Sequence, residues 1–349
     1  MSTATPRERH LLPSVTRIAD FDERSFSDTL EVAPLPRERW ATGQYVDVVV
    51  GPGPGGPFRL ERRDGRLAEI LPGDRLIGAL GSRAATLQVV GDWQRAPGGP
   101  GSPMDLLSMA GVVGVATSVS HFALPIAPLT YEGHVHRRSQ PLTMGDFSVT
   151  GPPGRLSTPV VLIIGTSMDA GKTIVGTRLV RLLRAQGATV AAAKLTGVGR
   201  YRDVQALGDA GADWIVDFVD AGLPSTAVPR ESFCAAVAPL LGHMDGLGAD
   251  VAVVEAGASP LEPYNGRTVI ELLGDAVKTA VLCASDPYAA AGVIQAFDTA
   301  PSVISGRAAS TTAAVELTER LTGHRCIDLL DQRGQRQMTE VLHRELELW

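Results

Sequence analysis

The chain has few of the features that mark secreted, membrane-spanning or disulfide-stabilised proteins. Its 349 residues include only three cysteines, and Cys234, Cys283 and Cys326 lie too far apart for a CxxC metal site or a disulfide framework. The first twenty residues contain no apolar run typical of a signal peptide. We therefore expect a reduced, cytoplasmic protein.

A long apolar segment is also missing. A membrane span needs about 20 strongly apolar residues, and the best candidate, Met109–Leu129, is interrupted by His121, Pro125 and Pro128. We interpret this segment as the end of a buried helix followed by a strand. An excess of positive charge is missing too, because 38 Asp and Glu residues outnumber 32 Lys and Arg residues. This balance argues against a nucleic-acid partner, and the lack of a basic amphipathic helix argues against a membrane partner.

The remaining composition is that of an ordinary globular protein. Apolar residues make up 44% and charged residues 20%, while 38 glycines and 24 prolines predict many turns. The length predicts two domains, and the sequence GlyProProGly at 151–154 is the best candidate for their boundary. We expect a β-rich accessory domain over residues 1–150 and an α/β domain over residues 155–349.

The first half consists of short extended segments separated by turns. Asp64-Gly65 predicts a hairpin, and we expect one short helix to begin at Ser102-Pro103 and to end near Gly111. The pattern predicts a barrel-like domain. Its expected strands are Tyr45–Val50, Phe58–Glu61, Arg66–Ile70, Leu76–Leu80 and Thr86–Val90.

A small polar cluster, HVHRR at residues 134–138, stands out in this half. His134 and His136 are two residues apart and would share one face of a strand, where they could bind a metal ion. No third ligand is evident in the sequence. We therefore expect a solvated basic edge strand.

The second half alternates between apolar strands and helices, which predicts a parallel sheet covered on both faces. A helix over about Lys172–Gln186 would bury Val175, Leu179 and Leu182 and end before Gly187. Further helices are expected over Ser232–Leu241 and Ser310–Leu321. The expected strands are Pro159–Gly165, Ala188–Ala193, Trp214–Phe218, Asp250–Glu255, Thr279–Cys283 and Ser302–Ser305.

The strongest motif is GTSMDAGKT at residues 165–173, between a buried strand and a helix. This context predicts a phosphate-binding (Walker A) loop, whose N–H groups and helix N-terminus surround anionic oxygens. Lys172 would reach the β and γ phosphates, and the Thr173 hydroxyl would bind Mg²⁺. The alternative is a glycine-rich turn with a surface lysine. The predicted nucleotide-binding residues are Gly165, Thr166, Ser167, Met168, Asp169, Ala170, Gly171, Lys172, Thr173 and Ile174.

The spacing of this motif suggests a family. Five residues, rather than the usual four, separate Gly165 from Gly171-Lys172, and the loop resembles the GTDTEVGKT-like loops of dethiobiotin synthetases and cobyrinate amidotransferases. By this resemblance Lys194, in AAAKLTG, helps to hold substrate and phosphate. Asp203, in the expected following loop, and Glu255, in DVAVVEAGA, correspond to acidic residues that hold Mg²⁺ in that family. Leu-Thr after Lys194 and AlaGlyAlaSer after Glu255 depart from the family pattern.

A second resemblance covers the same half of the chain. The segments ADWIVDFVDAG (212–222), VEAGASPLEPYNGRTVIELLG (254–274) and VLCASDP (281–287) resemble a P-loop family that includes a D-glutamate N-acetyltransferase. The two resemblances together cover roughly residues 158–330, and the first 150 residues match neither family.

Several of these side chains also have a purely structural interpretation. Asp169 could bind the metal through water or cap the next helix, and Lys194 could simply reach solvent. Glu255 could pair with a neighbouring helix, and Asp203 could pair with the adjacent Arg200 and Arg202. We place Lys172, Lys194 and Asp169 as catalytic candidates and Thr173, Glu255 and Asp203 as metal ligands.

Two further segments remain open. Asp286 could bind substrate or cap the following helix. The sequence Ser305-Gly306-Arg307 follows a late strand and is expected near the nucleotide base. No Asn-Lys-x-Asp guanine signature is present, which favours ATP.

These features favour an ATP- and Mg²⁺-dependent enzyme. Its expected reaction is γ-phosphoryl transfer to a small carboxylate or similar acceptor, as in a ligase or a kinase. The second resemblance implies an N-acyltransferase whose loop holds coenzyme A phosphates, and a non-catalytic nucleotide switch is a third alternative. The resemblance to the synthetases implies a homodimer.

Overall fold

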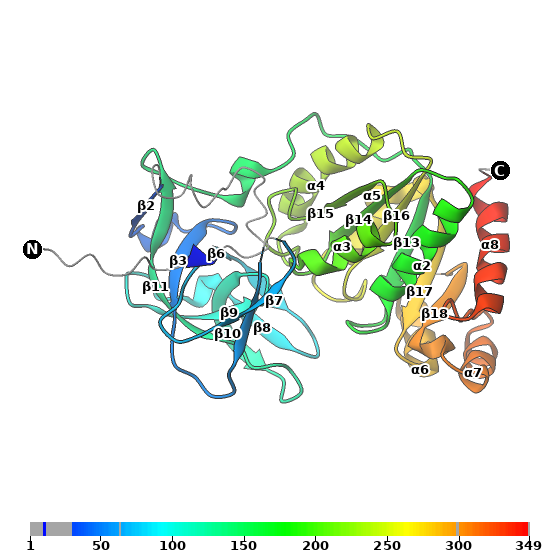
Figure 1. Ribbon diagram of the computed structural model, residues 1–349, viewed down its shortest axis with the longest axis horizontal. Coiled ribbons are helices and arrows are strands. Elements are labelled where there is room, and N and C mark those ends of the chain that lie inside the picture. The colour runs from blue at the N-terminus through cyan, green and yellow to red at the C-terminus, as the bar shows by residue number, and fades with distance from the viewer. Residues whose placement is uncertain (1–9, 12–29, 63, 298–299, 348–349) are drawn as a thin grey trace, which may run out of the picture. The chain divides into compact units, whose positions relative to one another are not determined.

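The chain divides into two compact units. The computed structural model describes residues 10–11, 30–62, 64–297 and 300–347 (Figure 1). The β-rich unit comprises Met1–Ser148, Val198–Arg202 and Val219–Ser225, and the α/β unit comprises Val149–Gly197, Asp203–Phe218 and Thr226–Trp349. Most of the N-terminal segment for which we expected no signal peptide lies outside the described residues. Within the described ranges, no helix is long and apolar enough to cross a membrane.

The β-rich unit is built around a closed ring of strands. Its sheet runs in the order β1-β6-β3-β11-β9-β10-β8-β7, and a further pairing of β6 with β10 closes the ring. The ring confirms the barrel-like prediction. The strand bounds are β1 His10–Leu11, β2 Leu30–Ala33, β3 Tyr45–Val50, β4 Phe58–Glu61, β5 Leu67–Ile70, β6 Arg75–Leu80, β7 Ser82–Ala84, β8 Val89–Asp92, β9 Pro103–Ser108, β10 Val112–Val119, β11 Pro128–Arg137 and β12 Gln140–Pro141.

The ring encloses an apolar core. Val46, Val48, Leu76, Val113 and Tyr131 are all buried in it. The hairpin predicted at Asp64-Gly65 joins β4 to β5, which pair antiparallel. This confirms the hairpin that Asp64-Gly65 predicted between two extended segments.

The predicted helix at 102–111 is wrong. Residues 103–108 form β9, which pairs antiparallel with both β10 and β11. Met104, Leu106 and Leu107 are buried from this strand, so tertiary pairing overrides the helix preference of Met and Leu. Met109–Leu129 accordingly contains β10 rather than a helix end. The strand predicted at Thr86–Val90 is also displaced, because Thr86 lies in a turn and β8 begins at Val89.

The interpretation of HVHRR as a solvated edge strand is wrong as well. At His134, β11 pairs with β2 on one side and with β3 on the other, and the His134 side chain is 0% exposed. Its Nδ1 hydrogen-bonds to the Tyr131 hydroxyl at 2.6 Å, and its Nε2 lies 3.1 Å from Gln44 Oε1. Burial, followed by the charge of His136, lowers the His134 pKa to about 3. The His134 imidazole therefore belongs to a buried hydrogen-bond network of the ring.

The α/β unit contains a six-stranded, entirely parallel sheet in the order β15-β14-β16-β13-β17-β18. The continuous apolar runs of the sequence become its buried central strands, which confirms the predicted α/β class. The strand bounds are β13 Val160–Gly165, β14 Val190–Thr196, β15 Trp214–Asp217, β16 Val251–Ala256, β17 Val277–Ala284 and β18 Val303–Gly306.

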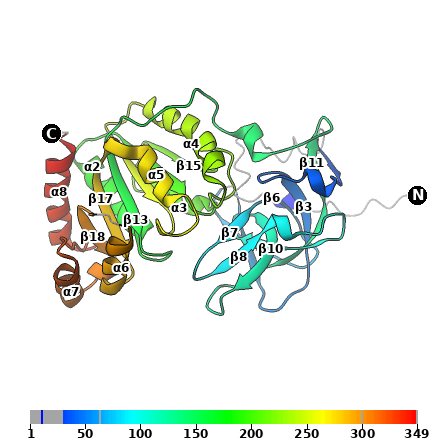
Figure 2. The ribbon, with the colours of Figure 1, turned by 180° about the vertical axis from the view of Figure 1, so that it is seen from behind.

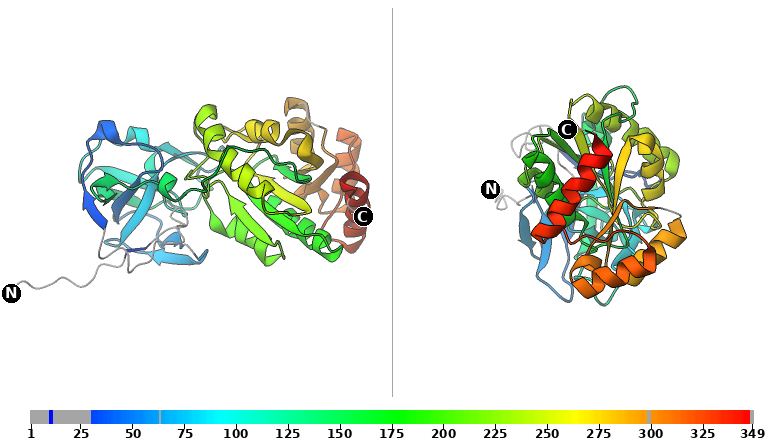
Figure 3. Two further views of the ribbon diagram at one scale, coloured as in Figure 1. Left: turned by 90° about the horizontal axis from the view of Figure 1, so that it is seen from above. Right: turned by 90° about the vertical axis from the view of Figure 1, so that its right-hand side faces the viewer.

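Helices cover both faces of this sheet. One face packs against α2, seen in front of the strands in Figure 1, and against α8, and the other packs against α5, which lies in front in Figure 2. Helices α6 and α7 pack against each other (Figure 3). The helix bounds are α2 Lys172–Ala185, α3 Tyr201–Asp209, α4 Arg230–Asp245, α5 Gly266–Leu273, α6 Pro287–Phe297, α7 Thr312–Thr322 and α8 Gln332–Leu346.

Candidate functional site

The predicted phosphate-binding loop joins β13 to α2 at the carboxyl edge of the parallel sheet. Gly171 stands at the N-cap of α2 with φ 97°, and Asp169 has φ 60°, so the loop passes twice through the left-handed region before the helix begins. The first N–H groups of α2 have no partner within their own helix. The loop therefore ends at a concentration of partial positive charge.

Lys172 lies across the beginning of this loop rather than in solvent. The residue is 6% exposed, and its Nζ donates a hydrogen bond to the Ser167 carbonyl at 2.7 Å. A Cβ on Gly165 would lie only 2.8 Å from that Nζ. Glycine at 165 therefore provides the space in which the lysine crosses the loop, and the ammonium is held against the Ser167 carbonyl.

The rest of the loop is held to the neighbouring strands. The Thr166 N–H donates to the Cys283 carbonyl at 3.0 Å, and the Thr166 hydroxyl accepts the Ser285 N–H at 3.1 Å. The Ser167 hydroxyl donates to the Met168 carbonyl at 2.8 Å. Ala170 is buried, whereas Asp169 and Ile174 are exposed. The loop is therefore an ordered turn, with Asp169 exposed in the turn itself and Ile174 exposed in the first turn of α2.

The end of β18 packs directly against the loop. The Arg307 N–H donates to the Ala170 carbonyl at 3.4 Å. A Cβ on Gly306 would lie 2.2 Å from the Ala170 carbonyl oxygen, so glycine is required at this contact. The segment Ser305-Gly306-Arg307 thus borders the loop, and its predicted place near a nucleotide base stays a prediction.

Glu255 and Thr173 form the second part of the site. The Thr173 hydroxyl donates to Glu255 Oε2 at 3.4 Å, and Glu255 is 3% exposed at the end of β16. Burial raises the Glu255 pKa, and the positive charges of Lys194 and Lys172 oppose that rise. A buried carboxylate beside a threonine hydroxyl is thus placed next to the first turn of α2.

Lys194 and Asp203 form a partly buried ion pair. Lys194 Nζ lies 2.5 Å from Asp203 Oδ2, and Lys194 is 6% exposed. Burial opposes the lysine's charge, but the attraction of Asp203 and Glu255 raises its pKa overall. Asp203 lies in the first turn of α3, so the prediction of a loop there is wrong. Lys194 does not simply extend into solvent.

Sequence reasoning missed one residue of this cluster. Asp217 is paired in register with Lys194, which in turn is paired with Glu255. The three charged side chains therefore stand in one row across β15, β14 and β16. Asp217 is buried, and its charge contributes to the raised Lys194 pKa. The signal available was a strand-end aspartate in WIVDF, the same pattern that identified Glu255.

The oxygen donors present fit a magnesium ion. Mg²⁺ is held by one or two carboxylates together with phosphate oxygens and waters, so it needs no cage of protein ligands. Thr173 and Glu255 supply a hydroxyl and a buried carboxylate in contact with each other. Among the described residues, no cluster of three or more His, Cys, Asp or Glu is placed to hold a metal ion by itself. Asp203 is engaged by Lys194, and its predicted role at the metal stays a prediction.

Two other strand-end residues have structural roles. The Asp286 carboxylate accepts the N–H groups of Tyr288 and Ala289 at 3.0 and 2.9 Å and so caps α6, and the Ala289 hydrogen bond is the main reason that its pKa is lowered. Burial raises the pKa of the Cys283 thiol to about 12. The buried thiol therefore stays protonated at neutral pH.

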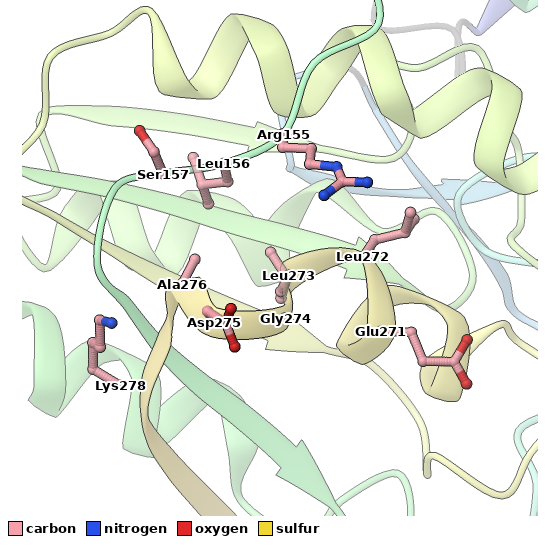
Figure 4. Close-up of a pocket in the computed structure, with 10 residues that line it drawn as sticks. All are labelled: Arg155, Leu156, Ser157, Glu271, Leu272, Leu273, Gly274, Asp275, Ala276 and Lys278. Carbon is pink, nitrogen blue, oxygen red and sulfur yellow. The ribbon is translucent and has the colours of Figure 1, made fainter.

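A hollow of about 520 Å³ in the α/β unit lies away from this site (Figure 4). Its lining comes from residues 155–157, 271–276 and 278. These residues precede β13 or lie around the first residues of β17. The hollow is therefore at the amino edge of the sheet, opposite the predicted phosphate-binding loop.

Comparisons with known proteins give distant similarities. No protein-family model matches this chain, and neither does any curated protein. Hydrogenase maturation factor HypB from Archaeoglobus fulgidus is 16% identical over 54% of this chain and 91% of its own, with a TM-score of 0.38. A DUF1611 family protein from Anabaena variabilis is 21% identical over 54% of this chain and 58% of its own, with the same TM-score.

A third solved structure is a nucleotide-binding protein from Archaeoglobus fulgidus in complex with ADP. It is 14% identical over 54% of this chain and 88% of its own, with a TM-score of 0.31. These three matches are distant structural similarities. At these scores the similarity assigns neither a family nor an activity, which leaves the geometry of the site as the guide to function.

Proposed function

We propose that the α/β unit binds ATP with Mg²⁺ and transfers the γ-phosphoryl group to a small carboxylate or a similar acceptor. The observation that carries the proposal is the group formed by Lys172, Thr173 and Glu255 at the N-terminus of α2. The buried Lys172 ammonium donates a hydrogen bond to a loop carbonyl. The Thr173 hydroxyl donates a hydrogen bond to the buried Glu255 carboxylate. A lysine, a hydroxyl and a carboxylate at the mouth of a strand–loop–helix turn suit a polyphosphate and a divalent cation.

In the proposed reaction the residues of this chain position charge rather than form covalent bonds. The loop N–H groups and Lys172 bind the β and γ phosphates, and Lys172 exchanges the Ser167 carbonyl for a phosphate oxygen. Thr173 and Glu255 hold Mg²⁺, which would neutralise charge on the phosphate oxygens. The acceptor oxygen forms a bond to the γ phosphorus while the bond to the β-γ bridging oxygen breaks and ADP leaves. Lys194, beside Glu255, orients an anionic acceptor.

Calorimetry with ATP and Mg²⁺ tests the binding step. Wild-type protein should bind ATP in a Mg²⁺-dependent way, and Lys172→Ala should weaken binding roughly 10- to 100-fold, because a charge-assisted hydrogen bond contributes about 1.5–3 kcal/mol. Arg181→Ala is the matched control, since Arg181 is an exposed cation on the same helix. Normal ATP binding by the Lys172→Ala variant would contradict the site.

Two alternative functions are outcomes of the same experiments. Tight binding of acetyl-coenzyme A instead of ATP would favour the N-acyltransferase. ADP release that needs no second substrate would favour a nucleotide switch, whereas release that requires a small carboxylate supports the proposed transfer.

Light scattering after gel filtration tests the homodimer that the resemblance implies.

A further inference from the structure

A buried carboxylate of the β-rich unit holds the first turn of α3. Glu61, the last residue of β4, is 0% exposed. Its Oε2 accepts the Tyr201 N–H at 2.9 Å, and its Oε1 accepts the Arg202 N–H at 3.0 Å. Both donors open α3 and belong, like Glu61, to the β-rich unit. Glu61 therefore caps this helix from 140 residues away along the chain.

The sequence before α3 explains why a distant cap is needed. Gly197, Val198, Gly199 and Arg200 precede the helix, and none has a side-chain oxygen that could accept its first N–H groups. Glu61 provides two such oxygens and a negative charge at the positive end of the helix. The amino end of α3 thus depends on a residue outside its own segment.

The next residue of the same helix turn belongs to the candidate site. Asp203 follows Arg202 directly, and its carboxylate holds the Lys194 ammonium at 2.5 Å. Lys194 and Glu255 are register neighbours, and each contributes to the pKa shift of the other. One helical turn therefore carries both the N–H groups held by Glu61 and the carboxylate that neutralises Lys194.

We propose that Glu61 is a positioning residue for the metal–nucleotide site, acting through the first turn of α3; this inference rests on the proposed function. With the turn capped, Asp203 pairs with Lys194 and leaves Glu255 available to a cation. With the cap removed, the turn frays and Asp203 withdraws from Lys194. The Lys194 ammonium then pairs with Glu255 and competes with Mg²⁺.

The test measures the Mg²⁺ concentration that gives half-maximal ATP binding. Glu61→Ala should raise it about 5- to 10-fold, as expected for the loss of a helix cap. Glu61→Gln keeps one acceptor oxygen and should give a smaller increase. Asp74→Ala is the matched control, because the Asp74 carboxylate also accepts a backbone N–H in the β-rich unit, from Leu71 at 2.8 Å, but does not touch α3. It should leave the Mg²⁺ requirement unchanged.

A double variant separates positioning from general stability. If Glu61 acts through Asp203, Glu61→Ala should not raise the Mg²⁺ requirement further in an Asp203→Asn background. The inference would be overturned if Glu61→Ala raised the Mg²⁺ requirement as much in the Asp203→Asn background as in the wild type. It would also be overturned if the folded Glu61→Ala and Glu61→Gln proteins had an unchanged Mg²⁺ requirement. Should Glu61→Ala not fold, Glu61→Gln decides alone. If the wild-type protein did not bind ATP, that result would instead refute the proposed function, and with it the site that Glu61 positions.

Discussion

The ion pair between Lys194 and Asp203 allows a quantitative test of the site. Asp203→Asn keeps the shape of the side chain and removes its charge. Lys194 is nearly buried, and the Asp203 side chain is 27% exposed. Breaking a buried pair costs about 3–5 kcal/mol, and a surface pair contributes about 0–1 kcal/mol. For this intermediate case we expect a loss of about 2 kcal/mol, or roughly 4–8 °C in Tm for a unit of this size.

The pH dependence of this loss has a defined sign. Asp203 and Glu255 raise the folded-state pKa of Lys194 against the opposing effect of burial. The stabilisation from the pair is therefore fully present below the unfolded lysine pKa, about 10.4. It is lost as the pH rises through the folded-state pKa. The difference in unfolding free energy between wild type and Asp203→Asn should accordingly be largest near neutral pH and shrink in strongly alkaline solution.

Urea unfolding of a double-mutant cycle checks the magnitude. The cycle combines Asp203→Asn with Lys194→Met and should give a coupling free energy of about 2 kcal/mol. Glu271→Gln is the control, because Glu271 pairs with Arg230 at 2.8 Å while both side chains are well exposed; its cost should stay below about 1 kcal/mol. Additivity of the two site substitutions within about 0.5 kcal/mol would refute the reasoning.

Two further predictions concern the ring and the loop. Because burial lowers the His134 pKa from 6.5 to about 3, the free energy of unfolding should fall by up to about 1.4 kcal/mol per pH unit between those values as the pH decreases. Denaturant titrations at several pH values should show a shallower decrease for His134→Gln, and an identical slope would contradict the buried neutral imidazole. Gly306→Ala should weaken ATP binding in calorimetry because its Cβ would displace the Ala170 carbonyl. A Cβ at Gly292 would have open space around it, so Gly292→Ala should leave ATP binding unchanged. Equal ATP binding by the two variants would contradict a role for the contact between Gly306 and the Ala170 carbonyl.

The strand–loop–helix frame of the site was predictable because it depends on short segments. The apolar run before Gly165 can only be buried, and Gly171-Lys172 begins an amphipathic helix. The alternation of strands and helices then implies parallel strands whose carboxyl ends share an edge. That rule, applied to the amino-acid sequence, is enough to place Lys172, Lys194 and Glu255 at one edge of the sheet.

The incorrect predictions concern segments whose structure is set by pairing with strands distant in sequence. Residues 103–108 contain Met and Leu, which suit a helix, but partners on both sides make this segment a strand. His134 looks like a surface residue in HVHRR, yet strands pair on both sides of it. In each case the deciding contact comes from a segment distant in sequence.

The sequence by itself determined the parallel α/β unit and the strand–loop–helix turn at its carboxyl edge, because both follow from local periodicity and from residue types at fixed spacing. Only the tertiary structure decided which charges meet: that Asp203 pairs with Lys194, that Asp217 joins their row, and that Glu61 caps α3. The physical reason is that electrostatic and hydrogen-bond energies depend on distance and burial, and neither quantity is encoded in any short stretch of residues.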